Sequence, residues 1–147
     1  MTPKALFNFF AKAEAVTWTA LIGGLIYRAV ATMEPIVLTV IGGIHGAVFL
    51  GYGVTAALVG VNQRWKVRAI VGGILLAIVP YATVPFEVSR NRKGLLEGSW
   101  RRTASSDPRD SGWFDRLFRW FIQRPVLLIL TLLLVVAGIF GFLVWMG

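Results

Sequence analysis

The chain has 147 residues, of which 56% are hydrophobic, and its formal net charge at pH 7 is +8. The hydrophobic share exceeds the roughly 45–50% of a soluble domain, and the mean hydropathy is +0.71. The absence of cysteine excludes disulfides and thiolate chemistry. With a single histidine and no cluster of acidic residues, we do not expect a metal or haem centre built from this chain alone. We therefore expect an all-α membrane protein without a cofactor, whose basic residues contact anionic phospholipids and not nucleic acid.

Four apolar segments approach the roughly 20 residues that a helix needs to cross a bilayer. They cover residues 13–31, 36–61, 69–86 and 126–146. The first segment begins beside Lys12 and Glu14 and lacks a small-residue cleavage site, so we expect it to stay in the mature protein. Pro35 ends a short connection between the first two segments, which predicts an antiparallel hairpin. The sequence thus predicts a bundle of four transmembrane helices, with residues 1–93 as a three-segment membrane domain.

The third segment leaves two arrangements open. Basic loops stay cytoplasmic, yet four full spans would place the basic residues near the N terminus and those of 89–124 on opposite faces. The third segment contains Pro80 and Pro85 in VPYATVPFE. If these prolines made it enter the membrane and return without crossing, the charges would agree, provided that protein covers its backbone.

Residues 89–124 carry nine basic and four acidic side chains. Residues 94–112 contain TASSDPRDSG and predict a flexible cytoplasmic loop, and we expect the whole of 88–124 to lie on the cytoplasmic side of a bacterial inner membrane. Residues 113–123 predict a basic amphipathic helix that lies in the interface before the last span, 124–147. A soluble helix packed on a partner is the alternative. The expected lipid headgroup contacts are Trp113, Arg116, Arg119, Trp120 and Arg124.

His45 is the one histidine, and it lies in the apolar stretch IGGIHGAVFLGYG. Ionisable groups inside a membrane suggest function, but a proton relay normally needs several of them, so a hydrogen-bonded packing residue is the simpler interpretation. From the expected depths, His45 reaches Thr17, Thr19 or a backbone carbonyl, and Tyr52 reaches Glu14. Glu14 could equally be a polar anchor at the interface. Small residues four apart, including Gly42 with Gly46, Gly43 with Ala47, and Ala137 with Gly141, predict close helix packing.

The stretches AEAVTWT, IGGIHGAVFLGY, QRWKV and VPYATVPFE together resemble the YdzA-like family of small bacterial integral membrane proteins, a domain of unknown function. The matching positions are Glu14, His45, Gly46, Trp65, Pro80 and Tyr81. The resemblance covers about residues 4–93. It departs from the family at Ala15, where a glycine usually follows the glutamate. The resemblance implies the helical architecture and no activity, and it does not reach the C-terminal extension.

Two functions follow as hypotheses. The first is a non-catalytic accessory subunit that binds other integral membrane subunits of a larger complex, with a respiratory-chain (cytochrome) supercomplex as the concrete expectation. The second is a small oligomeric transporter or proton-coupled carrier that uses His45, Glu14 and Tyr52, with the break at Pro80 as a gate. An enzyme acting on lipid is disfavoured because no nucleophile and base are placed together.

Overall fold

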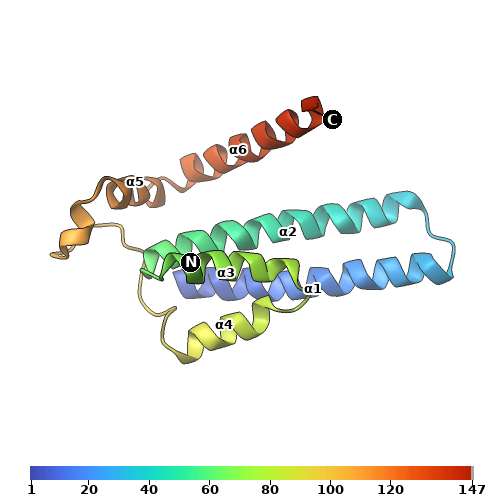
Figure 1. Ribbon diagram of the computed structural model, residues 1–147, viewed down its shortest axis with the longest axis horizontal. Coiled ribbons are helices and arrows are strands. Elements are labelled where there is room, and N and C mark those ends of the chain that lie inside the picture. Colours follow the sequence, from blue (N-terminus) through green and yellow to red (C-terminus); the bar gives the residue numbers. More distant parts are fainter. Residues whose placement is uncertain (147) are drawn as a thin grey trace. The chain divides into compact units, whose positions relative to one another are not determined.

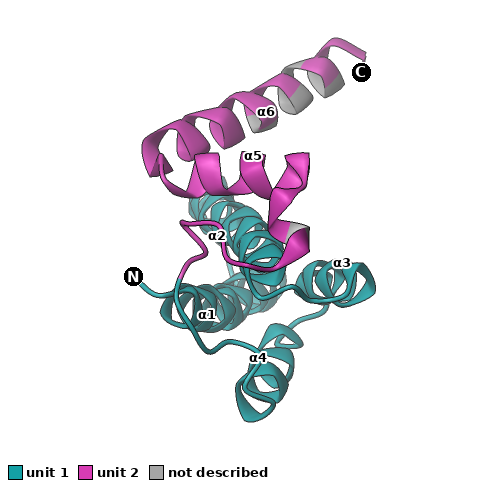
Figure 2. Ribbon diagram, turned by 90° about the vertical axis from the view of Figure 1, so that its left-hand side faces the viewer, with its two compact units in different colours: residues 1–99 teal, residues 100–147 magenta. Residues whose placement is uncertain are grey.

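The computed structural model describes residues 1–146, apart from the side chains of residues 109, 136, 139–141, 143 and 144. Throughout the described residues the regular structure is helical (Figure 1). The chain forms two compact units, Met1–Ser99 and Trp100–Gly147 (Figure 2). The elements are α1 Pro3–Val30, α2 Pro35–Asn62, α3 Val67–Leu75, η1 Leu76–Ile78, α4 Thr83–Arg92, η2 Pro108–Ser111, α5 Trp113–Ile122 and α6 Pro125–Met146.

Helices α1 and α2 form a long antiparallel pair. Each begins with a proline at its first helical turn, where no backbone N–H is lost from the helix. Thr2 caps α1 by accepting a 3.1 Å hydrogen bond from the N–H of Ala5. Each helix has 28 residues and is therefore about 42 Å long, enough to cross a bilayer. The predicted antiparallel hairpin is present, and both of its helices are candidate membrane spans.

After α2 the chain makes a second, shorter hairpin of α3, η1 and α4. Tyr52 of α2 bonds to the carbonyl of Gly73 in α3, and a Cβ on Gly60 would meet Ile70, so α3 returns antiparallel to α2. Asn91 of α4 bonds to Asn8 of α1. Figure 1 shows α3 and α4 beside the half of the α1–α2 pair that holds the N terminus.

The turn between η1 and α4 lies at about half the length of α1. Trp18 of α1 donates a 3.2 Å hydrogen bond to the carbonyl of Ala77, next to that turn. Trp18 is 15 residues beyond the first residue of α1, a distance of about 22 Å along the axis. Pro80 lies in the turn itself, and Tyr81 takes the left-handed backbone conformation with φ 66°. The predicted third helix over 69–86 is therefore two helices that run in opposite directions.

The number of membrane spans differs from the prediction for this reason. Two helices, α1 and α2, are long and apolar enough to cross a membrane. A third candidate arises among the described residues if α5 and the part Pro125–Val135 of α6, which are bent by 106°, count as one span. Four spans are not confirmed, because hydropathy counted the apolar residues of 69–86 without detecting the reversal at Pro80.

The glycines fall into two groups. At occupied positions an added Cβ would collide with another side chain, and at open positions it would meet no atom. A Cβ on Gly51 would lie 2.3 Å from the Phe10 ring, and one on Gly73 would lie 2.7 Å from the Phe86 ring. By contrast, a Cβ on Gly42, Gly43 or Gly46 would meet nothing within 4 Å. The expectation that Gly46 packs one helix of the chain against another is therefore wrong. The predicted pairing of Ala137 with Gly141 lies outside the described side chains.

In the second unit an ordered cluster forms around Asp110, which is 3% exposed. Its carboxylate accepts hydrogen bonds from Arg101, at 3.0 Å, and from the backbone and hydroxyl of Ser105, at 2.7 and 2.6 Å. Arg119 of α5 donates a 2.7 Å bond to the carbonyl of Asp110. Arg101 also pairs with Asp115 at 2.7 Å. These contacts tie part of the expected flexible loop 94–112 to α5.

Candidate intramembrane polar site

His45 lies on α2 and faces α1. Its Nδ1 is 3.0 Å from Thr17 Oγ1, and the Thr17 hydroxyl is 3.0 Å from the carbonyl of Glu14. A hydroxyl has one proton, so a Thr17 that donates to the carbonyl accepts from His45 Nδ1–H. The Trp18 ring covers the imidazole, with 4.6 Å between the ring centroids. The predicted contact of His45 with Thr17 is present, and it joins the two long helices.

Glu14 is fully buried, with 0% of its surface exposed. Its Oε2 is 3.3 Å from Thr83 Oγ1 on α4, and that hydroxyl is also 3.2 Å from the carbonyl of Ala11. Its other oxygen, Oε1, has no hydrogen-bond partner among the described residues. Glu14 therefore differs from the exposed interfacial anchor that its neighbour Lys12 suggested, because α4 folds back over it.

Tyr52 is also fully buried. Its hydroxyl donates a 3.1 Å hydrogen bond to the carbonyl of Gly73, and not to Glu14 as the helix depths suggested. The chain had no sequence signal for this partner, since Gly73 reaches Tyr52 only through the return of α3. The ring of Tyr52 packs beside Phe7, at 5.7 Å between centroids.

The three predicted groups belong to separate local contacts. His45 bonds to Thr17, Glu14 to Thr83, and Tyr52 to a backbone carbonyl. Among the described residues, no hydrogen bond links one of these three side chains directly to another. Among the described residues no group of three or more His, Cys, Asp or Glu side chains could hold a metal ion. The geometry thus supplies buried hydrogen bonds between helices and not a chain of titratable groups.

Trp65 and Arg90 form a second cluster that the sequence did not single out as a site. Trp65 is 8% exposed, and its Nε1 donates a 2.9 Å hydrogen bond to the carbonyl of Leu95. Its ring packs at 5.7 Å from Phe7 and at 6.0 Å from Phe86, between centroids. The guanidinium of Arg90 lies over the Trp65 ring, 4.8 Å from its centroid. The isolated Trp in QRWKV was a signal for this cluster, but Arg90 is 25 residues away in sequence.

On α5 the side chains expected at lipid headgroups separate into two groups. Trp113 and Trp120 are 71% and 43% exposed, and Arg116 is exposed too. The guanidinium of Arg124 lies 4.8 Å from the centroid of the Trp120 ring. Arg119 departs from the expectation: it is 8% exposed and lies 3.5 Å from the carboxylate of Asp110.

The comparison with known proteins identifies the first unit. A family model described as a domain of unknown function, DUF3817, matches residues 4–92. The chain belongs to the DUF3817 family. The match ends at the last residue of α4, so the DUF3817 region contains both hairpins, and it agrees with the membrane-protein family of unknown function that the motifs indicated over about 4–93.

One curated relative of the DUF3817 region is a protein of Streptomyces coelicolor named "Putative membrane protein SCO5905". It is 30% identical over 91 residues, which are 61% of this chain. The aligned part is 11% of the relative's own length. No solved structure matches the chain.

Proposed function

We propose that this DUF3817 protein is a non-catalytic accessory subunit of a larger complex in a bacterial inner membrane, held there by lateral helix packing. One observation carries the proposal. The outward stripe of α2 combines small and apolar side chains, and a Cβ at its glycine Gly43 meets no atom of the described chain within 4 Å. The stripe consists of Val40, Gly43, Ile44 and Ala47, all of them exposed.

Small residues allow close helix contact in lipid, where apolar burial alone drives no association. Gly43 and Ala47 are four residues apart and therefore adjacent on one helix face. The side chains of Val40 and Ile44, 51% and 55% exposed, flank them. The α1-facing side of α2 is already occupied by His45 and Tyr52. A helix from another integral membrane subunit would fit the opposite side.

A membrane topology accompanies this proposal. Helices α1 and α2 span the membrane, and the α3–α4 hairpin enters and leaves on one side. Of the Lys and Arg residues in Met1–Ser99, all but Arg28 then lie in the half that holds the N terminus. Because basic segments stay cytoplasmic, this half, together with loop 88–124, faces the cytoplasm. Four spans would place basic segments on opposite faces of the membrane, whereas this arrangement keeps them on one face.

As host we propose a respiratory-chain (cytochrome) supercomplex. This choice rests on analogy with small helical accessory subunits and on no motif of the chain. The test is purification of the tagged protein in mild detergent from cells that produce it. Co-purified subunits are identified by mass spectrometry, and haem is measured by the reduced-minus-oxidised absorbance spectrum. A different host without haem would contradict the supercomplex and leave the docking helix to be tested separately.

The docking stripe is tested by Gly43→Leu. This substitution adds bulk where the chain has open space, so the isolated protein should keep its thermal stability while co-purification falls. Gly23→Leu is the matched control, because a Cβ on Gly23 of α1 also meets nothing within 4 Å and that position is also exposed. Equal retention of the partner by both variants would contradict lateral packing through α2.

The alternative function is a small oligomeric transporter or proton-coupled carrier. The observation in its favour is Glu14, a fully buried carboxyl group whose Oε1 lacks a hydrogen-bond partner among the described residues. Against it, Glu14, His45 and Tyr52 bond to three separate partners among the described residues and not to one another. Proteoliposomes distinguish the two functions: a transmembrane proton flux that Glu14→Gln abolishes, with assembly unchanged, would favour the carrier.

A further inference from the structure

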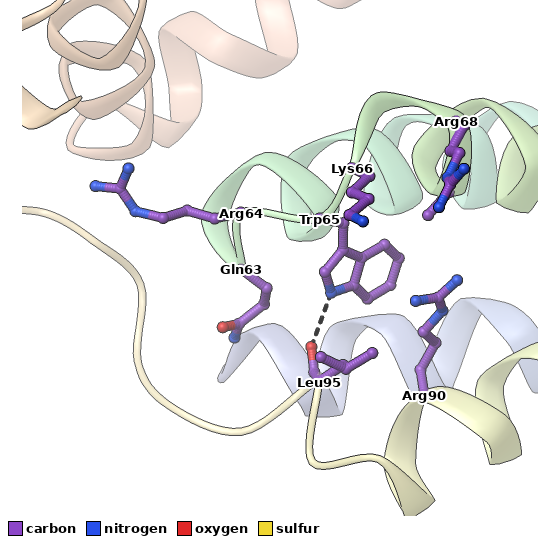
Figure 3. A pocket seen from close by; sticks show the side chains of 8 residues that line it. Gln63, Arg64, Trp65, Lys66, Arg68, Arg90 and Leu95 are labelled. Atoms are coloured by element: carbon purple, nitrogen blue, oxygen red, sulfur yellow. Dashed lines mark hydrogen bonds between the residues drawn. The ribbon is translucent and has the colours of Figure 1, made fainter.

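A pocket of about 380 Å³ opens where α2 ends, α3 begins and α4 passes (Figure 3). Trp65 lies at its centre, and its indole N–H donates a hydrogen bond to the carbonyl of Leu95. In Figure 3 the guanidinium groups of Arg68 and Arg90 point toward one another beside the indole. Lys66 also lines the pocket. Side chains from α3, α4 and their connection to α2 thus meet in one concave site.

The charge of the pocket has one sign. Half of its eight lining residues are Lys or Arg, and none of the eight is Asp or Glu. The nearest acidic side chain on α4, Glu87, accepts a hydrogen bond from Asn91. Arg90 is held in place because its guanidinium stacks on the rings of Trp65 and Phe86, at 4.8 and 4.7 Å. The guanidinium groups of Arg68 and Arg90, which face one another (Figure 3), repel each other unless an anion lies between them.

Two of the residues that line this pocket have a side-chain nitrogen without an acceptor. The side-chain nitrogen Nε2 of Gln63 and the Nε of Arg90 are buried and have no hydrogen-bond partner among the described residues. A buried unpaired donor is costly, so polar groups of these two residues are unsatisfied in the wall of the pocket. In addition, α3 starts beside the pocket, and its N-cap residue Lys66 makes no side-chain cap. The positive end of the helix dipole therefore adds to the field of the cations.

We propose that this pocket binds a phosphate group. A phosphate carries negative charge and several oxygen acceptors, and the planar guanidinium of arginine matches its geometry. The pocket directly follows Asn62, the last residue of a helix long enough to span the membrane. The headgroup of an anionic phospholipid, such as phosphatidylglycerol, is present at that level, and inorganic phosphate carries the same chemistry in solution.

The experiment uses the full chain in detergent micelles and counts bound lipid by native mass spectrometry. Phosphatidylglycerol and phosphatidylcholine are titrated separately, and inorganic phosphate is titrated in a further series. The test variant is Lys66→Gln with Arg68→Gln. The matched control is Arg92→Gln with Lys93→Gln, which removes the same charge from exposed positions that do not line the pocket.

We expect wild type and control to bind phosphatidylglycerol more tightly than phosphatidylcholine. The test variant should weaken phosphatidylglycerol binding by about tenfold or more, since each lost charge-assisted bond has at least that effect. Both exchanged side chains of the test variant are exposed, so its helical circular dichroism should equal that of wild type. Arg90→Lys keeps the charge and loses the planar group, and it should weaken binding as well.

The two phosphate sources give different results. If the lipid is the ligand, inorganic phosphate competes weakly or not at all. If free phosphate is the ligand, it binds wild type and control without any lipid, and its binding is lost in the test variant. Both results support a phosphate site. Equal loss of phosphatidylglycerol binding in test variant and control, or unchanged binding of both phosphatidylglycerol and inorganic phosphate in the test variant, would overturn it.

Discussion

Gly73→Ala provides a quantitative test of the hairpin that α3 and α4 form. A methyl group at this position would lie 2.7 Å from Cε1 and 2.8 Å from Cζ of Phe86. Carbon atoms prefer separations of about 3.5–4.0 Å, so the ring must move by about 1 Å. It has little room, because Phe7 and Trp65 lie 6.2 and 6.0 Å away between ring centroids, and Arg90 stacks on it at 4.7 Å.

Such overpacking costs about 1–3 kcal/mol. Alanine is a better helix former than glycine by about 0.5–1 kcal/mol, which offsets part of this cost. We therefore expect Gly73→Ala to lower the free energy of unfolding by about 1–2 kcal/mol. Gly46→Ala is the control: its methyl group meets no atom within 4 Å, so only the propensity gain of about 0.5–1 kcal/mol remains.

The measurement is unfolding of both variants in mixed micelles, with sodium dodecyl sulfate as denaturant and far-UV circular dichroism as the signal. Wild type should lie between the two variants. A Gly46→Ala protein that loses as much stability as Gly73→Ala would refute the assignment of occupied and open glycines. A neutral Gly73→Ala would show that the aromatic ring is free to move, contrary to the packing described above.

Three further predictions concern topology, His45 and the Asp110 cluster. Single cysteines are placed at the exposed positions Ser99 and Thr32 and treated with a membrane-impermeant thiol reagent in intact cells. Ser99→Cys should be protected, and Thr32→Cys should be labelled. Labelling of Ser99→Cys would contradict the cytoplasmic assignment. His45→Leu should lower the free energy of unfolding by about 1 kcal/mol or less, the typical value of one intramembrane hydrogen bond. His45→Gln should lower it less, because an amide can still bond to Thr17. A His45→Gln protein that is stable and assembled but has no activity would favour the carrier. Asp110→Asn removes the carboxylate beside Arg119 and one of the two carboxylates that Arg101 binds, a loss of about 1–3 kcal/mol of local stability. Limited proteolysis between Trp100 and Gly112 should therefore accelerate, and an unchanged cleavage rate would contradict the cluster.

Much of the first hairpin was predictable from the sequence, because long apolar runs separated by Pro35 leave few other arrangements in a bilayer. The same reasoning failed over 69–86. Hydropathy measures composition and not direction, so a segment that turns at Pro80 and one that crosses look alike. The charge pattern contained the missing information, since only a returning segment kept the basic residues together.

The polar site was predictable in part. Thr17 could be matched to His45 because both residues belong to one hairpin and their depths follow from the helical rise. Thr83 and Gly73, the partners of Glu14 and Tyr52, could not be found in that way, since their positions depend on how the second hairpin folds back. Likewise, the amphipathic pattern of α5 placed Arg119 on a polar face but could not show that Asp110 binds it.

The hairpin of α3 and α4 reaches about half the length of α1, so the first unit has different cross-sections in the two leaflets of a bilayer placed as we propose. The cytoplasmic leaflet contains segments of α1, α2, α3 and α4, grouped as in the end-on view of Figure 2, whereas the opposite leaflet contains α1 and α2 alone. A helix about 10–12 Å in diameter occupies roughly 80–110 Å² of membrane area. The first unit therefore displaces about 200 Å² more lipid from one leaflet than from the other. This wedge shape favours membrane that curves toward the side of the smaller cross-section, or a partner that fills the missing area there.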